Sequence, residues 1–197
     1  MKIKFSILLI AAIFLSACEI PGAVLATPSL PSVGQPVVTP GCISREPTQA
    51  DIDHALTYTG KIFSGIDWVR SYTVETNRVY VTWSNGPLNA LAFTEALIFE
   101  CGYTDSDIDA YFSGENWNTI FANYESYQAI SECKSTNKLR LYQFTAQKAG
   151  FEYAIKYWTL NDTDTRVMEL MIVFPVDSKS LMDEFSSRLF PELTSCK

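Results

Sequence analysis

The segment FEYAIKYWTLNDTDTRVMELMIVFP, residues 151–175, decides the fold of this chain. Its first seven residues alternate in hydropathy, as in a β-strand that buries one face. The side chains on that face are Phe151, Tyr153, Ile155 and Tyr157. A polar turn at 161–164 comes next, and residues 170–174 are apolar on both faces, which is typical of an inner strand. We therefore expect two neighbouring strands of one sheet here.

Similar patterns extend this sheet toward the N-terminus. The expected meander has four strands, at about 126–133, 138–146, 151–160 and 165–174. An earlier pair, 68–73 and 79–83, flanks a turn. Strands that occur in runs, rather than alternating with helices, favour an α+β fold with an antiparallel sheet. The sequence predicts a single domain with about six strands and four or so helices.

Helices are expected between and after the strands. Thr48 and Asp51 resemble a capping pair, and the apolar face after them runs to Phe63. Residues 88–99 are apolar nearly all round and come directly after Pro87, which predicts a central helix. Shorter or later helices are expected at 104–112, at 117–124 and from Asp177 or Ser178 to Pro191.

The first 17 residues have the architecture of an export signal, with two early lysines and then an apolar stretch of 11 residues. Within this segment, Leu15-Ser16-Ala17-Cys18 resembles the lipobox of bacterial lipoproteins. The resemblance covers this segment alone. It implies that the Cys18 sulfur carries a lipid and that residues 1–17 are removed. The expected location is the cell envelope, on the extracytoplasmic side of a membrane.

Residues 18–41 differ in composition from residues 42–197. They contain five of the nine prolines of the chain, and proline removes backbone donors and fixes φ. We interpret this segment as an extended, proline-rich tether that holds the domain clear of the membrane. The globular α+β domain is then expected to comprise residues 42–197.

The charge of the chain excludes one class of partner. The net charge is −7, and removal of residues 1–17 would leave 13 basic residues against 22 acidic ones. Nucleic-acid phosphates repel such a domain, so we expect no nucleic-acid binding.

Four cysteines lie beyond Cys18 in the chain, namely Cys42, Cys101, Cys133 and Cys196. An even count in an exported protein suggests two disulfides. Because Cys42 and Cys196 bracket the domain and chain ends often lie close together, we expect Cys42–Cys196 and Cys101–Cys133 among the three possible connectivities. A metal site requires closely spaced Cys or His pairs, and the sequence has no C-x-x-C, so no metal or cofactor is expected.

Several residues are candidates for chemistry. Three aspartates, Asp105, Asp107 and Asp109, lack the glycine and glutamate of a calcium loop and fit a helix start instead. His54, the only histidine, has no nucleophile motif to serve. Glu95 lies within the apolar run 88–99, where a buried carboxylate would indicate function and an exposed one would mark the solvent face of a helix.

The leading functional expectation is a non-enzymatic, membrane-anchored domain that binds an envelope protein or another envelope component. A carrier or sensor of a small apolar ligand is the alternative. A hydrolase of the envelope that uses two carboxylates ranks below both. The partner and the oligomeric state are left open.

The lipobox generates a direct test. Each buried methylene of a lipid chain contributes roughly 0.8 kcal/mol to membrane binding, so Cys18→Ala should release the protein from the membrane fraction. Intact mass measurement should show that the natural chain begins at an acylated Cys18. Unchanged membrane retention of the variant would contradict the assignment.

Overall fold

The computed structural model describes residues 45–100, 102, 104–135 and 138–197. The expected signal segment, the tether, Cys18, Cys42 and Cys101 lie outside these residues. In the part of the chain that is described, no helix is both long and apolar enough to cross a membrane.

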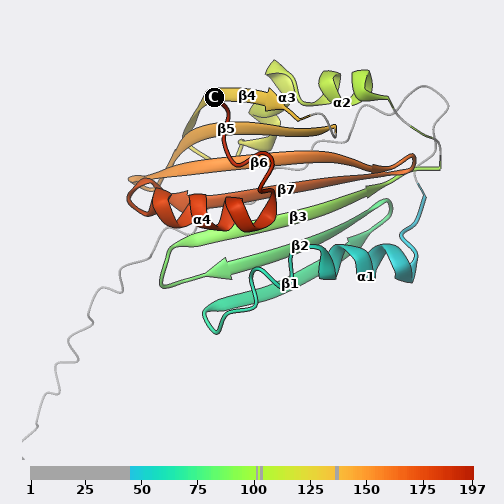
Figure 1. Ribbon diagram of the computed structural model, residues 1–197, viewed down its shortest axis with the longest axis horizontal. Coiled ribbons are helices and arrows are strands. Elements are labelled where there is room, and N and C mark those ends of the chain that lie inside the picture. The colour runs from blue at the N-terminus through green and yellow to red at the C-terminus, as the bar shows by residue number, and fades with distance from the viewer. Residues whose placement is uncertain (1–44, 101, 103, 136–137) are drawn as a thin grey trace, which may run out of the picture.

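One antiparallel sheet of seven strands forms the body of the molecule, in the order β1-β2-β3-β7-β6-β5-β4 (Figure 1). The strands are β1 (Trp68–Glu75), β2 (Arg78–Asn85), β3 (Ala90–Ile98), β4 (Ser126–Lys134), β5 (Leu139–Lys148), β6 (Phe151–Thr163) and β7 (Arg166–Pro175). The α+β class and the single domain are confirmed, and the strand count is seven rather than about six.

The chain builds the sheet from two meanders. The first, β1-β2-β3, leads through α2 (Asp105–Tyr111) and α3 (Gly114–Ile120) to the far edge of the sheet. The second, β4-β5-β6-β7, returns until β7 pairs with β3. The two strands that join the meanders are therefore central, which explains why both are buried along nearly their whole length.

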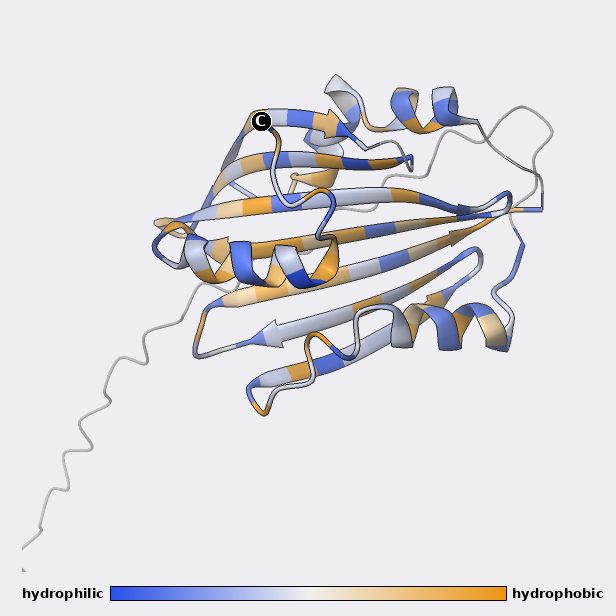
Figure 2. Ribbon diagram, in the orientation of Figure 1, coloured by the Kyte–Doolittle hydropathy of each residue, from blue (hydrophilic) through white to orange (hydrophobic). Residues whose placement is uncertain are grey.

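Helices cover both faces of this sheet. The α1–α4 face packs against α1 (Gln49–Tyr58), α4 (Lys179–Leu189) and the C-terminal residues, and α1 and α4 lie in front of the sheet in Figure 1. The α2–α3 face has its own core, rich in aromatic rings. Apolar and polar residues alternate along the strands and around α4 in Figure 2. Two separate apolar cores, one on each face, bury both faces of the sheet.

The sequence prediction is wrong for residues 88–99. This run is β3, not a helix, and Leu88 and Asn89 belong to the turn that precedes it. Asn89 adopts a left-handed φ of 49°, and the Asn85 side chain accepts a hydrogen bond from the Leu88 N–H at 3.0 Å. A strand buried on both faces is apolar on all sides, so its sequence lacks the period that separates strand from helix.

Most of the remaining elements lie close to their expected positions, but α1 ends at Tyr58 rather than continuing to Phe63, and α3 is Gly114–Ile120 rather than 117–124. Both predicted capping boxes are present, with Thr48 and Asp51 at the start of α1 and Thr104 and Asp107 at the start of α2. The four strands of the second meander and the C-terminal helix are confirmed, with ends that differ by up to three residues.

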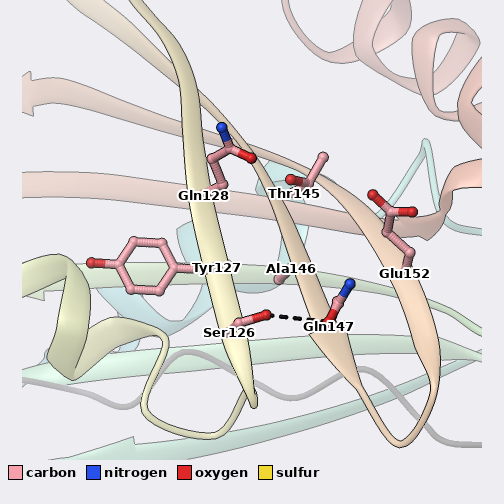
Figure 3. Close-up of a pocket in the computed structure, with 7 residues that line it drawn as sticks. All are labelled: Ser126, Tyr127, Gln128, Thr145, Ala146, Gln147 and Glu152. Atoms are coloured by element: carbon pink, nitrogen blue, oxygen red, sulfur yellow. Dashed lines mark hydrogen bonds between the residues drawn. The ribbon is translucent and has the colours of Figure 1, made fainter.

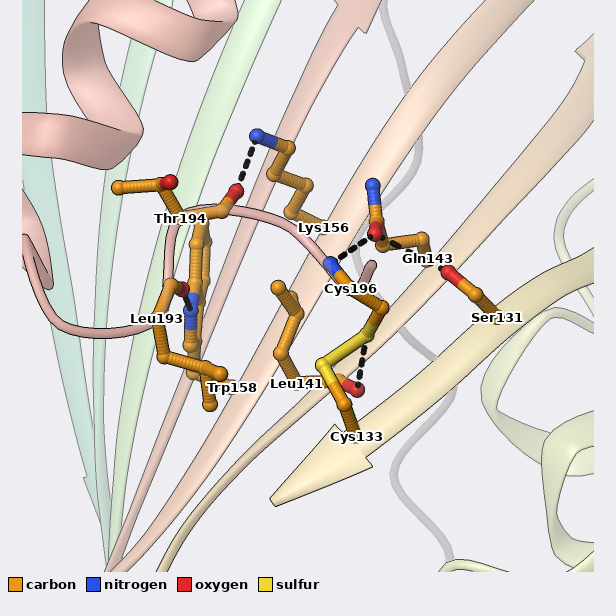
Figure 4. Close-up of a disulfide and its surroundings, with 9 residues drawn as sticks. All are labelled: Ser131, Cys133, Leu141, Gln143, Lys156, Trp158, Leu193, Thr194 and Cys196. Atoms are coloured by element: carbon orange, nitrogen blue, oxygen red, sulfur yellow. Dashed lines mark hydrogen bonds between the residues drawn. A yellow bond between two sulfur atoms is a disulfide. The ribbon is translucent and has the colours of Figure 1, made fainter. Parts of the chain in front are cut away.

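The C-terminal segment is fastened to the α1–α4 face at four points (Figure 4). Cys196 forms a disulfide with Cys133 of β4. The Cys196 N–H donates to Gln143 Oε1 at 2.9 Å, and Trp158 Nε1 donates to the Leu193 carbonyl at 2.9 Å. The buried Lys156 ammonium donates to the Thr194 carbonyl, to Ser186 Oγ and to Asp183 Oδ1 at 2.6–3.0 Å. These contacts tie α4 and the tail to the sheet.

The expected disulfide connectivity is wrong. Because Cys133 pairs with Cys196, neither Cys42–Cys196 nor Cys101–Cys133 can form. Closeness of the chain ends was the reason for the expectation. The C-terminal tail instead reaches the edge strand β4, to which the segment after α4 leads.

This fastening generates a stability test. The bond spans 63 residues, so the double change Cys133→Ser, Cys196→Ser should lower the free energy of unfolding by about 2–4 kcal/mol through the greater entropy of the unfolded chain. Urea unfolding of both proteins measures the difference. Reduction of the natural protein should lower stability more than reduction of the double variant, and an equal midpoint for the two oxidised proteins would contradict this role.

Candidate functional site

Two buried carboxylates lie side by side at the centre of the sheet. Glu95 of β3 is directly opposite Glu169 of β7 in the antiparallel register, so their Cα atoms are roughly 5 Å apart. Both side chains project from the α2–α3 face of the sheet. Glu95 is 3% exposed and Glu169 is 2% exposed. Burial of two like charges so close together is costly unless other groups compensate them.

Arg78 and Tyr157 bond to this pair, and Tyr80 bonds to Arg78. The Arg78 guanidinium forms an ion pair with Glu95 Oε1 at 3.2 Å and donates to the Tyr80 hydroxyl at 2.8 Å. The Tyr157 hydroxyl donates a hydrogen bond to Glu169 Oε2. Glu95 therefore has a charged partner, whereas the hydrogen bond to Glu169 comes from a neutral phenol.

The environment raises the pKa of both carboxyl groups. Burial raises the pKa of Glu169 to about 7, although the Tyr157 hydrogen bond and the Arg78 charge oppose this shift. Burial and the nearby Glu169 charge raise the pKa of Glu95 well above its ordinary value, with Arg78 acting in the opposite direction. The pair therefore retains a proton into the neutral range.

The pair is enclosed rather than open to a substrate. The aromatic core beneath α2 and α3, which includes Tyr111 and Tyr157, covers its side of the sheet. Facing acids in a cleft would favour hydrolysis of a glycan. Here burial of both acids separates them from any polymer, so this geometry gives the hydrolase hypothesis no support.

A different feature, the β1 edge, is open to solvent. Seven of the eight residues of β1 are exposed, and β1 pairs with β2 without a bulge. Val69 is 67% exposed on the α2–α3 face, and Tyr72 is 54% exposed on the α1–α4 face. Of the seven large apolar side chains that are exposed in the described residues, four lie between residues 66 and 74, namely Ile66, Val69, Tyr72 and Val74.

The opposite edge, β4, is built differently. Its pairing with β5 shifts register between Ala129 and Ser131, which marks a bulge or irregularity, and the disulfide and C-terminal tail lie beside it. Bulges and covering segments are devices that keep edge strands from pairing with other chains. Of the two edges, β1 is therefore the one left open for strand addition.

In the described part of the chain, two hollows lie on the α1–α4 face over β4, β5 and β6. The larger measures about 270 Å³ and is lined mainly by polar side chains, including Gln128, Gln147 and Glu152 (Figure 3). The smaller, about 130 Å³, lies beside α4, with Ala154 and Met182 in its lining. Pockets for small apolar ligands are usually about 300–1,000 Å³ and mostly apolar. Neither hollow fits the carrier hypothesis.

The other residues singled out in the sequence have structural roles. Asp107 caps α2, and Asp109 bonds to Arg140 at 2.9 Å and to Lys134 at 2.7 Å. Nε2 of His54 lies 3.4 Å from Asp162 Oδ2, and burial lowers the pKa of this imidazole. Within the described ranges, no group of three or more His, Cys, Asp or Glu residues could hold a metal ion.

Sequence reasoning identified Glu95 but placed it on a helix and missed its partner. Glu169 carries the same signal, because it is a single acid within the apolar run 167–174. Two such acids in two inner strands indicate a buried pair once the strands are known to be neighbours. Arg78 and Tyr157 carry no comparable signal.

The raised pKa of Glu169 generates a pH test. Because the folded-state value of about 7 exceeds the ordinary 4.5, the stability from its bound proton is complete below about pH 4.5 and is lost as pH rises through about 7. The loss should be on the order of 3 kcal/mol. Glu169→Gln, which keeps a neutral acceptor for Tyr157, should flatten the dependence of unfolding free energy on pH between 5 and 8.

Choline chloride should supply the ionic strength in this test, because its cation is too large to enter the buried space beside Glu169. Glu152→Gln, which changes an exposed acid on β6, is the matched control and should leave the slope as it is. Parallel curves for the natural protein and Glu169→Gln would contradict the assignment.

Comparison with known proteins does not identify a family for this chain. No family model matches the chain, and no curated protein matches it. Function must therefore be inferred from the sequence motifs and the geometry described above.

Proposed function

We propose that this chain is a lipid-anchored, extracytoplasmic interaction domain that binds an extended segment of a partner protein along the β1 edge. The observation that carries the proposal is the unbulged, exposed β1 strand with apolar side chains on both faces. In this proposal the domain has no catalytic task.

The membrane anchor is supported by the sequence. The lipobox-like Leu15–Cys18 segment comes after an export signal and precedes the proline-rich residues 18–41. The Cys133–Cys196 disulfide is consistent with an oxidising compartment outside the cytoplasm. An anchored domain at the end of a tether meets its partners at or near the membrane surface.

The chemistry of an open strand edge supports the choice of partner. An edge strand presents unpaired backbone N–H and C=O groups, and an added strand satisfies them with main-chain hydrogen bonds. Alternate side chains of the added strand would lie beside Val69 on one face and beside Tyr72 and Val74 on the other. Main-chain pairing provides affinity, and these apolar contacts provide selectivity.

The apolar contacts are strong enough to test individually. Full burial of such a side chain contributes about 1.5–3 kcal/mol, and 1.4 kcal/mol is a factor of ten in affinity. Val69→Lys and Tyr72→Lys should each weaken partner binding by at least about tenfold. Their folds should be unchanged, because both side chains already lie in solvent.

Site-specific photocrosslinking on intact cells provides the measurement. A photoreactive residue at position 72 should form a discrete adduct with another protein, and Val69→Lys in the same chain should remove most of it. Position 130 on β4 is the matched control, because Ile130 is also exposed, at 57%. Equal adducts at 72 and 130, or none at 72, would contradict the proposal.

A further inference from the structure

The central carboxylate pair is short of one positive charge. Two carboxylates, Glu95 and Glu169, are buried with one guanidinium, that of Arg78. The phenols around them are neutral, because burial raises the pKa of Tyr157 and of Tyr111 further above the ordinary value. When both acids are ionised, one negative charge is uncompensated in the interior, which is unfavourable without a counter-ion.

Neighbouring cations on this face are already engaged. Arg140 lies one strand beyond Thr159 in the same row across the sheet, but its guanidinium bonds to Asp109 and to the Asp105 carbonyl. Lys134, at the end of this row, bonds to Asp109. Glu75, at the solvent side, adds negative charge 3.9 Å from Arg78. Among the described residues, no further cation is therefore left to match the charge of Glu169.

A second, independent observation marks the place of the missing charge. Thr159 of β6 is directly opposite Glu169 in the β6–β7 register, so the two side chains are neighbours and project from the same face of the sheet. Thr159 has no exposed surface, and its Oγ1 has no hydrogen-bond partner among the residues that the structure describes. Glu169 Oε1 also has none within the described ranges. Two neighbouring buried oxygens without hydrogen-bond partners can supply part of the oxygen shell of a small cation.

We propose that Glu169 Oε1 and Thr159 Oγ1 belong to a binding site for a monovalent alkali cation, Na⁺ or K⁺, which neutralises the carboxylate pair when its proton is lost. This site is separate from the β1 edge of the proposed function. Oxygen ligands suit hard cations, and a single uncompensated charge selects a monovalent ion over a divalent one. The half-buried Tyr80 and the exposed Glu75 mark the side of the cluster that lies nearest to solvent.

Cation and proton compete for the same carboxylate. Below the pKa of Glu169 the proton supplies the neutralising charge and the cation has no advantage. Above that pKa the cation replaces it, so affinity for the ion rises with pH. The tyrosines and the arginine around the pair each remain in one state over this range, because their pKa values are raised above their ordinary values. Cation binding should therefore offset much of the stability that proton loss removes.

Thermal unfolding of the natural protein in matched salts tests the site. At pH 8, NaCl or KCl should raise the Tm by about 3–6 °C over choline chloride of the same ionic strength, at a salt concentration about tenfold above Kd. At pH 5 the difference should vanish. Glu169→Gln and Thr159→Val should each abolish the pH 8 difference, and Glu152→Gln should retain it.

Three outcomes would overturn the proposal. The first is a Tm at pH 8 that is the same in the three salts. The second is a cation effect that persists in Glu169→Gln, which would identify an unspecific salt effect. The third is an anomalous-scattering crystal structure, with Rb⁺ or Tl⁺ soaked at pH 8, in which no ion lies beside Thr159. Occupancy there, with loss in Glu169→Gln crystals, is the expected result.

Discussion

The pairing of β7 with β3 is the constraint on which the rest of the structure depends. It closes the two meanders into one sheet and fixes the register in which Glu95 faces Glu169. In that register two acids must share the buried centre of the sheet. The Arg78 ion pair, the Tyr157 hydrogen bond and a retained proton together reduce the repulsion between these two acids. The fold therefore places an electrostatic cost at its own centre.

Other buried cations act as fasteners between the sheet and its covering layers. Lys156 holds α4 and the C-terminal tail on one face, and Arg140 holds α2 on the other. A buried ion pair is a weak source of net stability, but loss of one partner is costly. Each of these buried cations thus fixes the position of one helix on the sheet. No described residue covers the β1 edge in this way, which is why we propose it as the place where a partner chain would bind.

Much of this architecture could be predicted from local patterns in the sequence. The capping boxes at Thr48 and Thr104 and the alternation in 151–157 have local causes, and these elements are confirmed. Residues 88–99 could not be assigned, because burial on both faces removes the periodic signal. The disulfide and the Glu95–Glu169 pair depend on strand order, which no local pattern contains. The anchor at Cys18 remains a prediction.

A carboxyl ¹³C titration of the glutamate-labelled protein in choline chloride decides whether the buried pair holds a proton at neutral pH. A shared proton requires one titration with an apparent pKa near 7 that belongs to the Glu95–Glu169 pair. It should disappear in Glu169→Gln and move to lower pH when NaCl or KCl replaces choline chloride. If every glutamate titrates in the ordinary range near 4.5, the pair neither retains a proton nor needs a cation, and its proposed role at the centre of the sheet is wrong.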